Sequence, residues 1–321
     1  MRLRLAAGTI IAAVAIAGCS DSGSDVNPAK DRSTEVSELQ KKVRDLRDRV
    51  ASREAAREEE AKSTAATGVA EAHSSMDRML SSLPGSAGLV IRAPGGEGPR
   101  LGGGRLTTGP AWSTIKIPVA ERILADNGGP KGISPAQREQ IHAAITLSDN
   151  DAAAALFSDL ESAHGGLNGA SEAVGEMLRQ AGDSQTRIST KGREGFTTYG
   201  QTDWSLAEQN RYMAALAGGC ISDAASRNLM LDEMAQVTAE PWGLGAAGVP
   251  AKWKGGWGPG TDGKYLVRQM GVIESGNREL VVTLAAVADD GSFGSAQAMA
   301  TRIARWAATN PGDDGPSAAA C

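Results

Sequence analysis

Histidine and cysteine are scarce in this sequence of 321 residues, which contains three of each. They form neither a Cys-x-x-Cys pair nor a His-Glu-x-x-His motif, so a zinc site would have to be assembled from distant, single side chains. We therefore expect neither a metal ion nor a cofactor. The 33 Lys and Arg against 38 Asp and Glu give a net charge of −5 and form no dense basic patch. Because nucleic-acid binding needs a concentrated basic face, nucleic acid is not an expected partner.

An uncharged apolar run over residues 5–18 follows two arginines at the N-terminus. At about 14 residues it is too short to span a bilayer and is typical of a secretory signal peptide. The run ends in Ile-Ala-Gly-Cys, which resembles a bacterial lipobox. The resemblance implies that residues 1–18 are removed and that a lipid on Cys19 anchors the protein to the outer face of the cytoplasmic membrane, in the cell envelope. Ordinary cleavage after Ala17, with Cys19 unmodified, is the alternative.

The next two segments differ sharply in composition. Residues 19–32 are small and polar and predict a flexible tether, whereas residues 33–63 are rich in Glu, Arg, Lys and Ala and predict a charged helix. Apolar residues recur in this helix at heptad spacing, namely Val36, Leu39, Val43, Leu46 and Val50. The spacing fits a short coiled coil, through which the chain would self-associate. Two heptads are fewer than a stable coiled coil usually needs, which favours the alternative of a single solvated helix.

Residues 64–309 have the composition of one globular domain, and residues 310–321 form a loop-like tail. The predicted order is a helix over 70–83, a strand over 88–93, a glycine-rich hairpin, a block of helices from about 113 to 218, strands over 251–257, 265–274 and 279–288, and a closing helix over 294–308. Consecutive strands without intervening helices favour an antiparallel sheet. We predict an α+β fold, in which this sheet is flanked by helices and accompanied by an all-helical subdomain.

Three short motifs carry the candidate chemistry. Ser113 and Lys116 form a Ser-x-x-Lys pair at the start of a predicted helix, which places both side chains on one face. A serine needs a base beside it to act as a nucleophile, and a desolvated lysine serves as one. The pair taken alone is equally explained by a helix-capping serine followed by a surface lysine. The other motifs are Ser148-Asp149-Asn150 and Lys254-Gly255-Gly256.

Together, these motifs resemble the Ser-x-x-Lys, Ser-Asp-Asn and Lys-Thr-Gly triplet of class A β-lactamases and penicillin-binding proteins, over roughly residues 70–309. The resemblance implies a β-lactamase/transpeptidase-like fold and an acyl-enzyme mechanism. In it, Ser113 would be the nucleophile and Lys116 its proton acceptor, while Ser148 and Lys254 would pass a proton to the leaving nitrogen. Lys254 would also attract a substrate carboxylate.

The resemblance also implies the substrate-binding residues. Asn150 would bind an amide of the substrate, and Gly256 and Trp257 would complete the substrate site. The backbone N–H groups of Ser113 and Trp257 would form the oxyanion hole, which acyl transfer needs to stabilise its tetrahedral intermediate.

Three departures from the family pattern affect the expected activity. Only 35 positions separate Ser113 from Ser148, which predicts a more open cleft. Gly255 replaces a Thr or Ser whose hydroxyl would help to bind a substrate carboxylate. The segment 187–203 lacks the Glu-x-x-Leu-Asn sequence whose Glu activates the deacylating water, and Glu194 within it fits an exposed loop charge better than a base. We therefore expect a burst of β-lactam acylation without sustained turnover.

Two functions remain open. The first is an envelope lipoprotein with serine acyl-transfer activity on an amide or ester, such as a peptidoglycan-type or β-lactam-like molecule. The second is an inert binding module on a helical stalk. Neither a Ser-His-Asp hydrolase nor a P-loop fits, because no Gly-x-Ser-x-Gly occurs and the Gly-x-x-x-x-Gly-Lys at 258–264 precedes a predicted strand. If Cys19 is lipidated, Cys220 and Cys321 are left either as a disulfide or as two free thiols.

Overall fold

The structure, a computed structural model, describes residues 28–96, 98 and 101–310, and divides the chain into units of residues 1–60 and 61–321. The predictions for the signal peptide, for Cys19 and for residues 311–321 lie outside the described residues. None of the described helices is both long enough and apolar enough to cross a membrane.

The first described element is one long helix, α1, over Pro28–Ser81. It begins inside the predicted tether and continues past the predicted boundary at residue 63, so those limits do not coincide with its ends. Proline is well tolerated in a first helical turn, and residues 29–67 contain neither Pro nor Gly to interrupt the helix. The five heptad residues are exposed, between 45% and 60%.

The second unit is built around a five-stranded sheet in the order β2-β1-β5-β4-β3, in which every neighbouring pair is antiparallel. The strands are β1 Gly85–Arg92, β2 Leu101–Gly104, β3 Ala251–Pro259, β4 Tyr265–Ser275 and β5 Arg278–Ala288. The helices are η1 Trp112–Ile115, α2 Lys116–Asp126, α3 Pro135–Thr146, α4 Asn150–His164, α5 Leu167–Gln180, η2 Tyr199–Gln201, α6 Leu206–Gly218, α7 Ala224–Ala235, η3 Gly243–Ala246 and α8 Phe293–Thr309. The predicted α+β class is confirmed.

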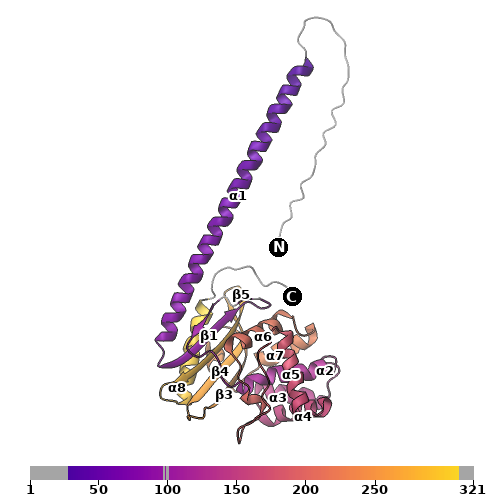
Figure 1. Ribbon diagram of the computed structural model, residues 1–321, viewed down its shortest axis with the longest axis vertical. Helices are drawn as coiled ribbons and strands as arrows, with labels where there is room; N and C mark the ends of the chain where they lie inside the picture. Colours follow the sequence, from indigo (N-terminus) through magenta and orange to yellow (C-terminus); the bar gives the residue numbers. More distant parts are fainter. Residues whose placement is uncertain (1–27, 97, 99–100, 311–321) are drawn as a thin grey trace. The chain divides into compact units, whose positions relative to one another are not determined.

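Helices cover both faces of the sheet (Figure 1). Helix α8 and the last turns of α1 bury one face through residues such as Met76, Leu80 and Ile303. On the other face, α6 packs against β1 and β5 and joins a helical layer made of α2 to α7. This arrangement leaves β3 as an edge strand that contacts η1, the short 3-10 helix that contains Ser113.

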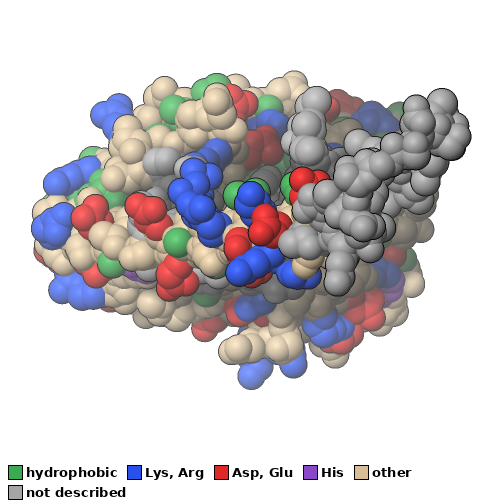
Figure 2. All heavy atoms as spheres, turned by 90° about the horizontal axis from the view of Figure 1, so that it is seen from above, with side chains coloured by type: hydrophobic (Ala, Val, Ile, Leu, Met, Phe, Trp, Pro, Cys, Tyr) green, Lys and Arg blue, Asp and Glu red, His purple; other side chains and the backbone are tan. Residues whose placement is uncertain are grey.

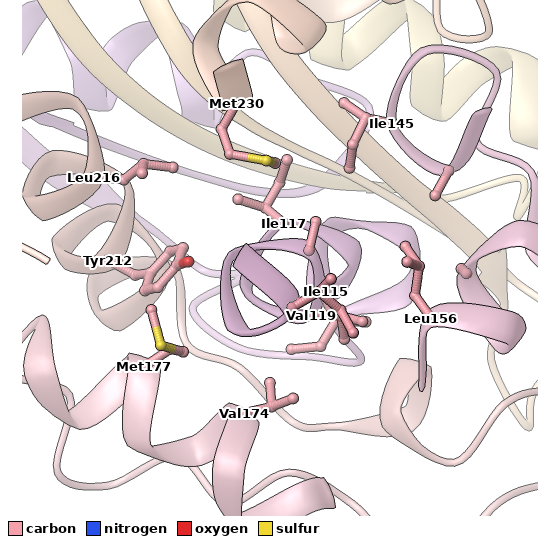
Figure 3. Packing of buried hydrophobic residues seen from close by; sticks show 14 of the residues in the cluster. Ile115, Ile117, Val119, Ile145, Leu156, Val174, Met177, Tyr212, Leu216 and Met230 are labelled. Carbon is pink, nitrogen blue, oxygen red and sulfur yellow. The ribbon is translucent and has the colours of Figure 1, made fainter. Parts of the chain in front are cut away.

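Helix α2 is the centre of the helical layer. Figure 3 shows apolar side chains of η1 and α2 surrounded by side chains from five other helices. The labelled neighbours are Ile145 of α3, Leu156 of α4, Val174 and Met177 of α5, Tyr212 and Leu216 of α6, and Met230 of α7. Since a helix that is buried on all sides cannot shift without disturbing every neighbour, this packing gives the Ser113 turn a rigid support.

Charges of both signs are mixed among the described residues that Figure 2 shows from above. In Figure 2, Lys and Arg side chains lie beside Asp and Glu side chains across the described part of one face. This face therefore presents alternating charge rather than a field of one sign.

Candidate active site

The Ser113 turn is held in a strained backbone conformation. Trp112, directly before the serine, has φ +49°, and Ser148 has φ +56°; among the described residues these are the two with positive φ that are not glycine. Such strain persists only where the surroundings enforce it, and it is concentrated at functional sites. Part of the enforcement comes from the buried Arg268, which donates hydrogen bonds to the carbonyl oxygens of Gly109 (2.7 Å) and Pro110 (3.0 Å) just before the turn.

Lys116 is buried, with 3% of its surface exposed. Its Nζ donates to the carbonyl oxygens of Ser148 (2.7 Å) and Asp149 (3.1 Å) and to Oδ1 of Asn150 (2.8 Å). Burial, and then the nearby positive charge of Lys254, lowers the pKa of Lys116 to about 7. The three bonds use all three N–H groups of the ammonium form, and none of them goes to Ser113. Loss of one proton would free a lone pair on Nζ.

The second motif forms the start of α4. The Asp149 carboxylate caps the helix by accepting a hydrogen bond from the backbone N–H of Ala152 (2.7 Å). This cap fixes Asn150 as the first residue of α4 and leaves Ser148 in the left-handed turn before it. Oδ1 of Asn150 accepts a hydrogen bond from Lys116, and the expected binding of a substrate amide by Asn150 stays a prediction.

The third motif lies on the edge strand β3. Lys254 is fully buried, and its Nζ donates to Oγ of Ser148 (2.9 Å), to the carbonyl oxygen of Gly255 (2.9 Å) and to Oε1 of Glu240. Burial lowers the pKa of Lys254, and the charge and hydrogen bond of Glu240 act in the opposite direction. A Cβ on Gly256 would lie only 2.7 Å from the backbone nitrogen of Ser113, so glycine allows β3 to approach the Ser113 turn closely.

Sequence reasoning missed Glu240. Its side chain is fully buried, forms an ion pair with Lys254, and accepts a hydrogen bond from the backbone N–H of Gly255 (2.5 Å) through Oε2. One signal was available, because Glu240 is the only charged residue between Glu233 and Lys252 in the sequence. A single carboxylate in such an apolar, glycine-rich stretch often has a specific buried partner.

These elements surround a cavity of about 460 Å³. Its lining consists of Trp112, Ser113, Lys116, Leu147, Ser148, Asn150, Gly195, Phe196, Thr197, Tyr199, Gly200, Gln201, Ala239 and Trp257. Ser113, Lys116, Ser148, Asn150 and Trp257 are thus brought together, while Lys254 and Gly256 lie behind the lining. A larger hollow of about 860 Å³, between residues 67–78 and the end of α8, contains none of the motif residues.

The segment 187–203 supplies one wall of the cavity. The guanidinium of Arg193 stacks 4.3 Å from the ring centroid of Phe196 and 5.7 Å from that of Trp112, and it donates to the carbonyl oxygen of Pro259 (2.7 Å). Glu194 is exposed and is not among the lining residues. The lining within the described residues contains no carboxylate.

The remaining candidates lie elsewhere. His142 pairs with Glu233 (2.8 Å) and His164 with Asp126 (2.7 Å), and neither histidine lines the cavity. Cys220 is disulfide-bonded. The alternative of two free thiols therefore does not hold for Cys220. The other two cysteines lie outside the described residues, so a bridge to Cys321 stays a prediction.

Comparisons with known proteins concern the family and the fold of the chain. The family model described as the beta-lactamase enzyme family matches residues 127–309, a range that begins after Lys116 and contains the second and third motifs. No curated protein gives a significant match.

Solved structures show the same fold at low sequence identity. The TLA-1 extended-spectrum beta-lactamase is 16% identical, covers 77% of this chain and 100% of its own, and superimposes with a TM-score of 0.60. The beta-lactamase from Chitinophaga pinensis (17% identity, TM-score 0.59) covers 74% of this chain and 97% of its own. The putative class A beta-lactamase PenP from Rhodopseudomonas palustris (21% identity, TM-score 0.57) covers 74% and 98%. The family match spans more than half of the sequence, and the chain therefore belongs to the beta-lactamase enzyme family.

Proposed function

We propose that the protein is a serine acyl-transfer enzyme that cleaves an amide or ester, with Ser113 as nucleophile. One observation carries the proposal: Ser113, Lys116 and Ser148 line one cavity, and burial lowers the pKa of Lys116 to about 7. A lysine with this pKa is about half neutral near pH 7 and acts as a base, whereas an ordinary lysine does not.

Acylation proceeds by one substitution at the carbonyl carbon of the substrate. The Ser113 hydroxyl gives its proton to neutral Lys116, and Oγ forms a bond to the carbonyl carbon. The bond from that carbon to the leaving nitrogen or oxygen then breaks. The leaving group takes a proton from the Ser148 hydroxyl, which Lys254 replaces through their 2.9 Å hydrogen bond. Backbone N–H groups of Ser113 and Trp257 stabilise the oxyanion.

Hydrolysis of the acyl-enzyme needs a base that activates water, and it is slow where such a base is missing. The described lining of the cavity offers no carboxylate for this step, and Glu194 is exposed outside the lining. The expected kinetic signature with a β-lactam is a burst of about one equivalent followed by little turnover.

Intact-mass spectrometry of the protein treated with a fluorophosphonate or a penicillin tests both statements. We expect a stable, stoichiometric adduct on the wild type and none on Ser113→Ala. Sustained nitrocefin hydrolysis that Ser113→Ala abolishes would contradict slow deacylation. Absence of any adduct on the wild type would refute the enzymatic function.

We also propose that the protein is a lipoprotein of the cell envelope, where peptidoglycan-type amides are the accessible substrates. The N-terminal apolar run and the Ile-Ala-Gly-Cys sequence before residue 20 support this location. Mass spectrometry of the membrane-extracted protein should find a diacylated or triacylated Cys19. An unmodified mature N-terminus would contradict the proposal.

An inert binding module is the second candidate. Two observations favour it: no hydrogen bond of Lys116 goes to Ser113, and Glu240 compensates the charge of Lys254. The adduct experiment separates the two functions, because a binding module retains affinity for its ligand without forming a covalent bond.

A further inference from the structure

Lys254 has no hydrogen-bonding capacity left for a substrate. A lysine ammonium has three N–H donors, and those of Lys254 are directed at Ser148, the carbonyl oxygen of Gly255 and Glu240. Both members of the Lys254–Glu240 pair are fully buried, so solvent screens their interaction little. The positive charge behind Ser148 is therefore neutralised from within the protein.

Glu240 also occupies the space that a side chain at position 255 would need. A Cβ on Gly255 would lie 2.8 Å from Oε2 and 2.9 Å from Cδ of Glu240, distances that real Cβ atoms do not show. A side chain that carries a hydroxyl at position 255 and the carboxylate of Glu240 therefore cannot occupy this space together. The carboxylate fills the place beside Lys254 and accepts the hydrogen bond of the Gly255 N–H.

We propose that Glu240 is a specificity-determining residue, which acts as a built-in counter-ion of Lys254 and selects acyl donors that are uncharged on the leaving-group side. This inference rests on the proposed acyl-transfer function and deepens it by naming the substrate class. Lys254 contacts Ser148, the proton donor to the leaving group, so its charge acts on that side of the substrate. A carboxylate there would meet a neutral pair rather than a cation.

The described lining of the cavity supports the same class of substrate. Lys116 is its only charged member, and apart from glycines the rest are hydroxyl, amide, aromatic or aliphatic side chains. Trp112, Phe196 and Trp257 provide apolar contact area, whereas no arginine is present to bind a carboxylate in a bidentate manner. Neutral esters and amides fit this lining better than acidic ones.

Benzylpenicillin and its methyl ester test the proposal, because they differ only in the carboxylate. Binding is measured on Ser113→Ala through the fluorescence of Trp112 and Trp257, which line the cavity, and acylation is measured on the wild type by intact mass. We expect the wild-type pocket to bind the methyl ester at least as tightly as the acid. If the wild type instead prefers the acid by tenfold or more, that result alone overturns the inference, before any substitution of Glu240 is made.

The variant Glu240→Gln removes the negative charge and keeps an oxygen for the Gly255 N–H. In this variant, the affinity for the acid divided by the affinity for the methyl ester should rise roughly tenfold, because a buried charge acts strongly over a few ångströms. The ratio of the two acylation rates should rise by the same factor. Glu194→Gln makes the same change in net charge at an exposed position and should leave the ratio unchanged. Circular dichroism establishes that each variant is folded.

The outcomes separate the two proposals. An unchanged ratio in folded Glu240→Gln, or an equal rise in Glu194→Gln, would overturn the role of Glu240. A missing adduct with every probe on the wild type would refute the acyl-transfer function, and the binding ratio on Ser113→Ala would still decide whether Glu240 selects neutral ligands.

Discussion

The pKa of Lys116 yields a quantitative prediction about the pH dependence of acylation. Burial and the charge of Lys254 lower this pKa from 10.5 to about 7. Since only the neutral amine accepts the Ser113 proton, the acylation rate should follow the neutral fraction of Lys116. That fraction is about one tenth at about pH 6 and about nine tenths at about pH 8. The rate should therefore rise roughly tenfold over this interval and then reach a plateau.

An unperturbed lysine would behave differently. With a pKa of 10.5, the neutral fraction would rise about a hundredfold between about pH 6 and pH 8 and would show no plateau there. The assay is rapid-quench intact-mass spectrometry with a fluorophosphonate, a probe that does not titrate in this range. A profile without a plateau, or one that falls as pH rises, would refute Lys116 as the base.

Lys254→Met provides the matched perturbation. Lys254 lowers the pKa of Lys116 more than Glu240 raises it, so removing the lysine should move the midpoint of the profile above 7. Exposed Glu194→Gln should leave the midpoint in place. A midpoint that moves down in Lys254→Met would contradict the electrostatic reasoning.

The same shift has a consequence for stability. Because the folded pKa of Lys116 lies below the unfolded value, the unfolded chain binds more protons between about pH 7 and 10.5, and the free energy of unfolding rises with pH across that interval. Relative to Lys116→Met, the rise is at most about 5 kcal/mol. Chemical denaturation of both proteins at several pH values measures it, and parallel curves would contradict the lowered pKa.

Three further predictions concern packing, a buried acid and the long helix. Gly255→Ala should lower the free energy of unfolding by about 1–3 kcal/mol, because the added methyl group would clash with Glu240. Gly294→Ala should not lower it, because no atom lies within 4 Å of the added methyl group. Equal thermal unfolding of the two variants would contradict the clash. Burial raises the pKa of Glu121 from 4.5 to about 7, so the folded state binds more protons than the unfolded chain between these two pH values and loses stability as the pH rises through them. Glu121→Gln should therefore raise Tm more at pH 8 than at pH 5. An equal gain in Tm at the two pH values would argue against the raised pKa. Leu46→Glu should abolish self-association through α1 in sedimentation experiments, and a monomeric wild type would rule that association out.

Local patterns were sufficient for most of the fold. Apolar runs bounded by turn residues predicted the three consecutive strands to within two residues of β3, β4 and β5, and the closing helix was predicted to within one residue of α8. The extent of α1 was predicted poorly, because helix propensity contains no signal for a domain boundary inside an uninterrupted helix. Ser113 lies in a 3-10 turn rather than in the α-helix, a distinction that depends on Arg268 and β3 packing around the turn.

The sequence by itself determined the three motifs, their order and the scarcity of His and Cys. Because His and Cys are scarce, the candidate chemistry depends on serine and lysine. These features are legible because they are short and local. Only the tertiary structure decided the electrostatics of the site. Glu240 lies 14 residues before Lys254 in the chain, and no periodicity connects them. Their pairing depends on a chain path that buries both in the same place, where low polarity makes a counter-ion necessary.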